Sequence, residues 1–343
     1  MDIFSTHVLN RVVEHLDRPA SFLLDKFFPS IQTEDSEEIH FDIDKSKPRI
    51  APFVSPLVQG KVVTSEGFET KSFKPAYVKD KRRFDPNAPL KRLIGEKIGG
   101  NLSAMNRREA ALNKSLKSQV ENLTRREEVM AAEALRTGKI TVTGEDYPTQ
   151  IIDFKRDPSL SQVLTGAVRW GEDGVKVLDD IEDWAGDIQS KSGAAARTVV
   201  MDPKAWRLFK NDPKVEKQLE LRRGTNSSIN IDPIAFGQGN EKARYGGSIG
   251  DFDFWIYNDT YVDDEGNDQS LLPEYTVILA SQGLLEGTRC YGIILDEKAS
   301  YKANRYFTKS WLEEDPAVRW LLMQSAPLVV PFRPNATFCA TVR

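Results

Sequence analysis

The feature that most constrains the fold of this chain is the order of its elements between residues 51 and 145. A β-rich stretch punctuated by prolines, Ala51 to Leu93, precedes a segment without glycine or proline, Asn101 to Thr137, and the strand-like run TGKITVTGE follows. The first stretch has too few apolar residues to form a core of its own. We therefore expect an extended arm that lies on something else, next to one very long helix.

The arm is predicted to be a long β hairpin. Its two β-rich runs, Val58 to Thr64 and Phe68 to Val78, meet around residues 65–67. Its prolines remove backbone donors, which suits an exposed ribbon, and a two-stranded ribbon alone is only marginally stable in water. The alternative is an insertion without functional consequence. If the ribbon packs on a neighbouring subunit, the contact candidates are Phe53, Leu57, Val62, Val63, Phe68, Phe73, Tyr77, Arg82 and Arg83.

The segment after the arm is predicted to be a single amphipathic helix from Asn101 to Thr137. Asn101 fits an N-cap, and Gly138 stands where helices end in a left-handed residue. At about 1.5 Å per residue such a helix is roughly 55 Å long. A coiled-coil strand is the alternative, but the apolar stripe is not a sustained heptad. The stripe that we expect to be buried consists of Leu102, Met105, Leu112, Leu116, Val120, Leu123, Met130 and Ala134.

The middle of the chain is predicted to be a mixed α/β domain. Apolar residues at helical spacing mark a helix between Val177 and Ile188, and Arg197 to Met201 is predicted to be a short strand. Asp202-Pro203 and Asp212-Pro213 each combine a capping aspartate with a proline at the first helical position. We therefore expect two further helices to begin there.

Four β segments complete the expected fold. Lys139 to Thr143 and Gln150 to Phe154 form a hairpin directly after the long helix, and Val318 to Val330 and Ala336 to Val342 are further strands. We expect the last two segments to rejoin that hairpin. The domain around the long helix would then be discontinuous in sequence.

Four segments carry a resemblance to a known family. They are FVSPLVQGKVV in the arm, the long helix with TGKITVTGE, the pair MDPKAWRLFKND and LRRGTNS, and RWLLMQSAPLVV. In this order they resemble the major capsid proteins of tailed bacteriophages, above all the lambda-type major head proteins, which have the Hong Kong 97-type capsid fold. The resemblance implies an α+β fold with an N-terminal arm, a β-hairpin arm, a spine helix, a peripheral β domain and a central α/β domain.

The resemblance also implies domain bounds and a second group of site residues. The N-terminal arm would span residues 1–42, the β-hairpin arm 43–93, the peripheral domain 94–160 and 313–343, and the central axial domain 161–312. The Gly-, Asn- and Ser-rich loop from Arg222 to Asn240 would cluster at the centre of a ring of subunits, although an ordinary surface loop explains its composition equally well. The candidates in this loop are Arg222, Arg223, Asn226 and Asn230.

The implied function is structural rather than enzymatic. The subunit would self-assemble into pentamers and hexamers that form the icosahedral head shell of a virion, after assembly in the host cytoplasm. The chain lacks a long, charged, helical prosegment, so the resemblance implies a separate scaffolding protein, with portal and decoration proteins as further partners. Some members of the family join their subunits by Lys–Asn isopeptide bonds. The arm contains lysines and Asn335 lies near the end of the sequence, so such a crosslink is an open alternative. An encapsulin-like compartment shell is the nearer alternative and a serine hydrolase the remote one.

Composition is compatible with this role. The chain of 343 residues is 40% apolar and 29% charged, and its net charge is −4. A net negative charge gives no general affinity for phosphate backbones. The resemblance implies a shell that encloses DNA, and we expect no sequence-specific binding to that DNA. No run of about 18 apolar residues predicts a membrane span, and no signal-peptide pattern opens the chain.

The only catalytic pattern is the G-x-S-x-G match at residues 246–250. A hydrolase elbow needs a strand before the serine, a helix after it and a histidine further along the chain. Here the strand-like DFDFWIYND follows Ser248, and the last histidine is His40. We therefore expect a glycine-rich turn and no catalytic residue.

The remaining candidate ligands predict no metal site and no cofactor. Cys290 and Cys339 lie in strand-like runs and are expected to be small core residues. His7, His15 and His40 have no spacing that would place a pair on one helix face. The acidic group Asp263, Asp264, Glu265 and Asp268 has the wrong spacing for a calcium loop, so a hairpin turn explains it.

Overall fold

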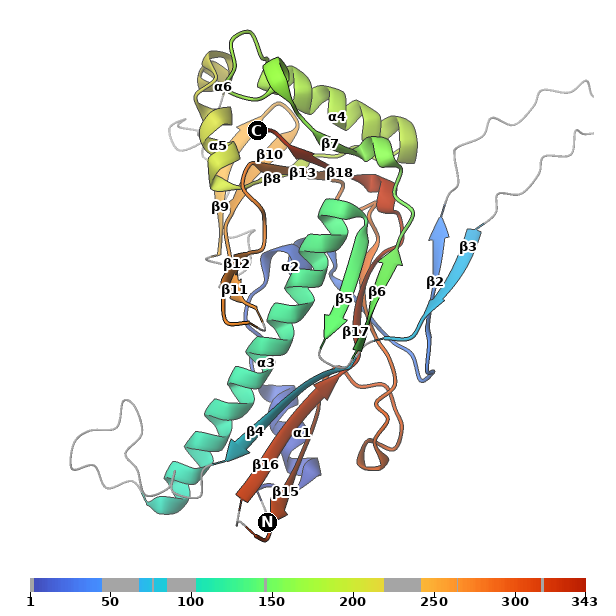
Figure 1. The fold of residues 1–343 in the computed structure, drawn as a ribbon, viewed down its shortest axis with the longest axis vertical. Helices are drawn as coiled ribbons and strands as arrows, with labels where there is room; N and C mark the ends of the chain where they lie inside the picture. The colour runs from blue at the N-terminus through green and yellow to red at the C-terminus, as the bar shows by residue number, and fades with distance from the viewer. Residues whose placement is uncertain are drawn as a thin grey trace, which may run out of the picture.

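A computed structural model describes residues 3–44, 68–75, 77–84, 103–144, 147–218, 242–263, 265–315 and 318–343. These residues build an elongated molecule (Figure 1). A six-stranded sheet with its helices lies at one end, a three-stranded sheet lies at the other, and the long helix α3 (Ala104–Thr137) connects them. The C-terminus lies at the first end and the N-terminus at the second.

Both ends of α3 are fixed by local chemistry. The Ser103 hydroxyl accepts a hydrogen bond from the Asn106 amide at 3.1 Å, so Ser103 is the N-cap and the prediction of Asn101 was wrong. The predicted end is confirmed, because Gly138 has a φ of 66° and its amide bonds to the carbonyl of Ala134. A side chain at this position would also collide with Arg156, whose Cβ would lie 2.6 Å from the added Cβ.

The predicted stripe of α3 is buried over most of its length. Leu112, Leu116, Val120 and Leu123 pack in the cluster at the N-terminal end of the molecule, and Met130 and Ala134 belong to the main core. Met105 is 68% exposed, which contradicts the prediction. Met105 lies in the first turn of α3, at the end of the helix that Figure 1 shows farthest from the six-stranded sheet. Leu102 lies outside the described residues.

The main core lies around a central six-stranded sheet. Helices α4 (Val177–Ser192) and α5 (Pro203–Lys210) lie beside it, followed by the short α6 (Pro213–Gln218). The caps predicted at Asp202 and Asp212 are confirmed, since their carboxylates accept bonds from the amides of Lys204 and Lys214. The strand order is β7 (Ser161–Val163), β18 (Thr337–Thr341), β13 (Thr276–Ala280), β8 (Thr198–Met201), β10 (Phe252–Tyr257) and β9 (Ala243–Ile249).

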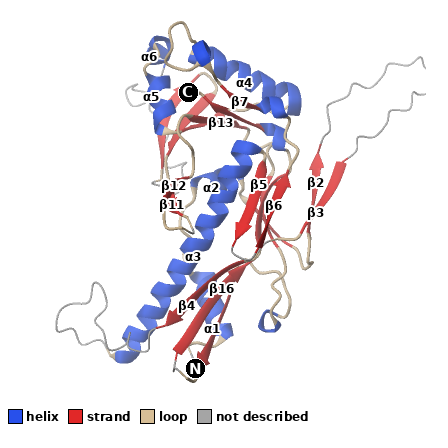
Figure 2. Ribbon diagram, in the orientation of Figure 1, coloured by secondary structure: helices blue, strands red, loops and turns tan. Residues whose placement is uncertain are grey.

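The second core lies under a three-stranded sheet at the opposite end. Its strands are β15 (Phe307–Glu313), β16 (Val318–Ser325) and β4 (Val78–Phe84). One face of this sheet packs on α1 (Thr6–His15) and α3, through a cluster that includes Leu9, Leu116 and Leu321. Figure 2 shows the helix–sheet sandwich that results.

Smaller elements join the two ends. A third sheet has the order β1 (Ser30–Thr33), β14 (Gly287–Tyr291), β17 (Pro327–Pro331), and α2 (Phe22–Phe27) packs on α3. The 3₁₀ turns are η2 (Pro158–Leu160), η3 (Gly166–Val168), η5 (Glu297–Ala299) and η6 (Pro334–Ala336). The two-stranded sheets are β2 (Ile39–Asp44) with β3 (Phe68–Phe73), β5 (Lys139–Gly144) with β6 (Tyr147–Asp153), and β11 (Thr260–Val262) with β12 (Asp268–Ser270).

The strand pairing of the arm differs from the prediction. The predicted run Phe68 to Val78 is divided: β3 pairs with β2, and Val78 begins β4, which pairs with β16 in another sheet. The predicted partner, Val58 to Thr64, lies outside the described residues. Pattern alone could not select β2, because pairing across 23 intervening residues depends on tertiary packing and not on local propensity.

The C-terminal strands also pair differently from the prediction. The hairpin β5–β6 forms as expected, but β16 pairs with β15 and β4, β17 with β14, and β18 with β13 and β7. The strands therefore do not rejoin the hairpin. Instead β17 and β18 pack on α3, whose C-terminal part is apolar on several faces.

One further expectation is corrected. Ser248 lies inside β9, opposite Asp253 of β10, and the turn is at Gly250 and Asp251, so the glycine-rich segment is mainly strand. The segment expected as an N-terminal arm contributes buried residues to the main core: Phe22, Leu23, Leu24, Phe27 and Phe28. Asp263, Glu265 and Asp268 lie at the predicted hairpin turn between β11 and β12, and Asp264 lies outside the described residues.

Candidate assembly site

The ribbon β2–β3 projects from the body of the molecule (Figure 1). Its base is anchored: the rings of Phe41 and Phe154 lie 5.7 Å apart, and the Lys71 ammonium donates to the backbone oxygen of Asp153 at 3.1 Å. Phe73 packs against the main core. The ribbon therefore leaves the subunit at a fixed point, while residues 45–67, which connect its strands, lie outside the described part.

The predicted contact residues divide between internal and exposed positions. Phe73 and Tyr77 are used within the subunit; the Tyr77 hydroxyl donates to the Ile293 carbonyl and accepts from the Leu295 amide. Arg82 pairs with Asp80 at 2.7 Å, and Arg83 is exposed. Of Phe68 only the backbone is described. The other candidates lie outside the described residues: Phe53, Leu57, Val62, Val63, Arg222, Arg223, Asn226 and Asn230.

Sequence reasoning missed a fully buried carboxylate on α3. Glu128 accepts hydrogen bonds from the backbone amides of Leu23 and Leu24, both at 2.9 Å, and from the Tyr257 hydroxyl at 2.8 Å. The two amides belong to the first turn of α2, which has no bonding partners of its own for them. Glu128 therefore caps α2 from another helix and ties the N-terminal segment to the long helix and to β10.

The neighbouring carboxylate is buried in a second polar group. Glu127 accepts a hydrogen bond from the Tyr291 hydroxyl at 3.0 Å and lies 3.8 Å from the Arg305 guanidinium. Burial raises the pKa of Glu127 to about 7, while Arg305 and Tyr291 act in the opposite direction. Burial also raises the pKa of Glu128, against its three hydrogen-bond donors.

A sequence signal for this burial existed. The stretch VMAAEAL that follows the two glutamates is apolar on nearly every face of the helix, which indicates burial from several sides. A carboxylate next to such a stretch needs dedicated donors. The two glutamates therefore hold neighbouring elements on α3. Glu128 joins α2 and β10 to this helix, and Glu127 joins β14 to it.

The C-terminal end of α3 is held by a buried arginine. Arg156 donates to the carbonyls of Leu135 and Arg136, and to the hydroxyls of Ser161 and Thr337. Burial lowers its pKa to about 10. A cation at the carbonyl end of a helix is favourable because the helix dipole is negative there. Arg156 therefore fastens the long helix to the central sheet.

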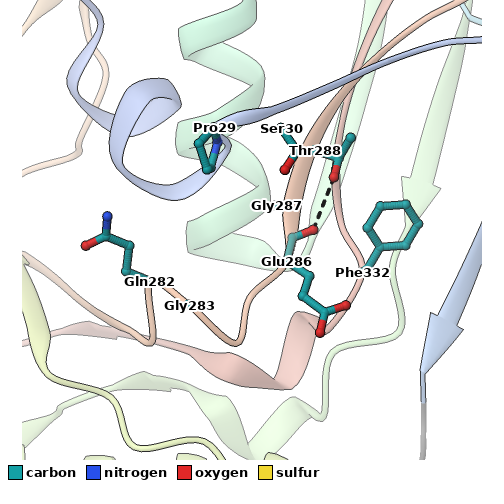
Figure 3. Close-up of a pocket in the computed structure, with 8 residues that line it drawn as sticks. All are labelled: Pro29, Ser30, Gln282, Gly283, Glu286, Gly287, Thr288 and Phe332. Atoms are coloured by element: carbon teal, nitrogen blue, oxygen red, sulfur yellow. Dashed lines mark hydrogen bonds between the residues drawn. The ribbon is translucent and has the colours of Figure 1, made fainter.

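A cavity of about 680 Å³ lies where the chain leaving α2 meets β14 (Figure 3). Gly287 is required there, since an added Cβ would lie 2.1 Å from the backbone oxygen of Phe27. The Thr288 hydroxyl donates to the backbone carbonyl of Glu286 at 3.3 Å and not to a side chain that could act as a general base. The lining is Pro29, Ser30, Gln282, Gly283, Glu286, Gly287, Thr288 and Phe332.

The other predicted chemical residues occupy structural positions. Cys290 and Cys339 are buried free thiols in β14 and β18, as predicted for small core residues. In the described part of the chain, no three His, Cys, Asp or Glu side chains come together as metal ligands. Among the described helices, none is both long and apolar enough to span a membrane.

Comparison with known proteins agrees with this architecture. The family model described as phage major capsid protein E matches residues 5–342. The chain is 30% identical to the major capsid protein of Enterobacteria phage phi80 and 28% identical to that of Escherichia phage lambda, over 98% of each chain in both cases. It is 29% identical to the major capsid protein of Escherichia phage N15, again over 98% of both chains.

Solved structures show the same fold. A crystal structure described as that of a prophage capsid protein from E. coli CFT073 superposes with a TM-score of 0.76 at 22% identity, over 99% of both chains. The capsid of Ralstonia phage GP4 gives a TM-score of 0.53 at 11% identity, over 95% of this chain and 92% of that one. The fold is thus the Hong Kong 97-type capsid fold. Because the family model covers nearly the whole sequence and the architecture agrees, the chain belongs to the phage major capsid protein E family.

Proposed function

We propose that this major capsid protein of a tailed phage assembles into pentamers and hexamers that close an icosahedral shell around the viral DNA. The observation that carries this proposal is the ribbon β2–β3, which is anchored at its base and projects from the subunit. A two-stranded ribbon gains too little burial from its own chain to be stable. A neighbouring subunit would supply the missing contacts.

The finer organisation belongs to the same proposal. The ribbon and the residues up to 93 form the arm, α3 forms the spine of a peripheral domain, and residues 161–312 form the axial domain at the capsomer centre. The strand β18 extends the axial sheet rather than the peripheral one. We also propose a separate scaffolding protein, a portal and a decoration protein as partners, and assembly in the host cytoplasm. Family membership favours this role over an encapsulin-like shell or a hydrolase.

The test replaces the connection between the two strands of the arm. Residues 46–66 are exchanged for a short Gly-Ser linker, and the protein is expressed with its neighbouring phage genes. We expect soluble subunits with a wild-type circular dichroism spectrum that form no shells in electron micrographs, because intersubunit burial of roughly 25 cal/mol per Å² is lost at every contact.

A matched control makes the result specific. Replacing Glu172 and Asp173, in an exposed turn of the central domain, by Ser and Gly should leave shell formation unchanged. Wild-type particles from the arm variant would show that the arm is dispensable. A wild-type protein that stays monomeric with its neighbouring gene products would refute the proposed assembly itself.

A further inference from the structure

The outer face of the three-stranded sheet β15–β16–β4 is only partly covered by the described residues: at one end Phe307 and Gln324 are buried against the segment around Asp296 and Ala299, whereas the middle of the face is half-open. The other face packs on α1 and α3. Trp311 and Trp320 stand opposite each other in the β15–β16 register, and Leu322 lies two residues further along β16 on the same side. All three are only half-buried, and none belongs to a hydrophobic cluster of the described chain. They form an aromatic stripe.

A basic column runs beside the aromatic stripe on the edge strand β4. Lys79, Lys81 and Arg83 alternate along this strand at spacings of about 7 Å, and the register places Arg83 next to Trp320. Lys81 lies 4.2 Å from the centre of the Trp320 ring. All three side chains are exposed, and no carboxylate of the described chain forms an ion pair with them. The face therefore combines apolar area with an excess of positive charge along β4, while the Glu313 carboxylate on β15 accepts from the Trp320 ring N–H.

The hairpin β11–β12 presents the complementary combination. Val262 is 64% exposed and stands directly opposite Asp268 in the register. The turn between them is preorganised, since the Asp263 carboxylate accepts from the amides of Glu265 and Asn267 at 3.0 and 2.8 Å. Glu265 and Asp268 are exposed. Here an apolar side chain lies beside exposed carboxylates.

We propose that the β11–β12 hairpin of one copy docks on the outer face of the β15–β16–β4 sheet of a second copy. Val262 meets the aromatic stripe, and Glu265 and Asp268 face Lys81 and Arg83. Figure 1 shows the hairpin and the sheet well apart on one chain, so they meet only between copies. Each copy then contacts one neighbour through its hairpin and another neighbour through its sheet, as in a closed ring. The inference rests on the proposed self-assembly and specifies one of its contacts.

Nucleic acid is the competing occupant of a basic aromatic face. The net charge of −4 and the acidic, partly apolar hairpin on the same chain favour a second copy. Charge complementarity of this kind selects partners and excludes wrong ones, since like charges brought together are unfavourable. The two occupants therefore respond differently to reversal of the hairpin charges.

The test is a charge-swap cycle on the full chain, expressed with its neighbouring phage genes. The variants are Lys81→Glu with Arg83→Glu, Glu265→Lys with Asp268→Lys, and all four changes together. We expect each pair to lower shell yield by about tenfold or more, and the fourfold variant to restore it to within about twofold of wild type. Circular dichroism of the subunits checks that every variant is folded.

The control carries the same change in net charge elsewhere: Lys298→Glu with Lys302→Glu, both exposed. Its shell yield should equal that of wild type. The docking is overturned if either charge-reversed pair assembles normally, if the fourfold variant fails to recover, or if the control loses shells as strongly. Shells that form normally with the Lys81 and Arg83 changes but retain less DNA would identify nucleic acid as the occupant. Absence of shells from wild type would instead overturn the proposed assembly, and the docking with it.

Discussion

At the scale of single residues, Glu128 is the position at which we expect a substitution to be most destabilising. Three donors converge on this fully buried carboxylate: two backbone amides of α2 and the hydroxyl of Tyr257. Removing one partner of a buried, charge-assisted network costs more than the network contributes, because the other partners stay buried without a bond. Glu128 thus controls whether the N-terminal segment stays on the spine helix.

We expect Glu128→Gln to lower the free energy of unfolding by about 2–4 kcal/mol. A glutamine offers one oxygen, so its amide group would face a backbone N–H that can only donate. Urea denaturation of the isolated subunit at pH 8 measures the loss. Glu121→Gln, on the exposed face of the same helix, is the control and should be neutral. Equal stability of the two variants would mean that the amides find other acceptors.

Glu127 predicts a pH dependence with a definite sign. Its pKa is 4.5 as a free side chain and about 7 in the fold, so between these values the folded state keeps a proton that the unfolded state has lost. The free energy of unfolding therefore falls as the pH rises from about 4.5 to about 7, by roughly 3 kcal/mol from this group. Above pH 7 it has no further effect.

The measurement compares wild type with Glu127→Gln, which cannot titrate at this position. The stability difference, wild type minus variant, should decrease steadily over this pH interval and level off above it. Glu128 titrates in both proteins, so its contribution largely cancels in the difference. A difference that is constant with pH would show that burial does not raise the pKa of Glu127 in the folded state.

At the scale of elements, α3 combines two environments in one helix. Its first half is amphipathic and lies against α1 and one sheet, whereas its last turns are enclosed by α2, β17 and β18. The helical period predicted the buried side of the first half correctly, except at Met105. The sequence indicates that the second half is enclosed, but it does not identify the enclosing elements, because they are distant in sequence.

Adjacent substitutions on α3 test the buried stripe. Leu116 is fully buried, and Lys117, one residue further, is exposed. Leu116→Asp places an unpaired carboxylate in the core and should cost about 4 kcal/mol or more, which leaves little soluble subunit. Lys117→Asp should give soluble protein with an unchanged melting temperature. Similar soluble yields of the two variants would contradict the packing of α3 on the sheet and α1.

At the scale of the whole molecule, the ribbon β2–β3 projects from a packed body and is anchored to it at its base through Phe41 and Phe73. The N-terminal residues expected to form an arm are part of the body, since Phe22 to Phe28 contribute fully buried side chains to the main core. Stability should therefore reside in the body. The variant with residues 46–66 replaced should unfold at the same temperature as wild-type subunits while failing to assemble, as measured by calorimetry and electron microscopy on one preparation.

The sequence by itself determined the local features of this protein. The long helix and its end at Gly138, the caps at Asp202 and Asp212, the hairpin after the helix and the core positions of Cys290 and Cys339 depend on residues close together in the chain. Periodicity, capping and turn chemistry act over a few residues, so they can be recognised without a structure.

Tertiary structure alone decided which strands distant in sequence meet and which polar groups are buried. Nothing local distinguishes β2 from other partners of β3, or assigns β16 to β4 rather than to the hairpin β5–β6. The same holds for Glu128, whose burial depends on donors from α2 and β10 more than 100 residues away in sequence. Strand pairing and polar burial are set by the balance of packing and desolvation over the whole chain, and a short stretch of sequence does not contain that balance.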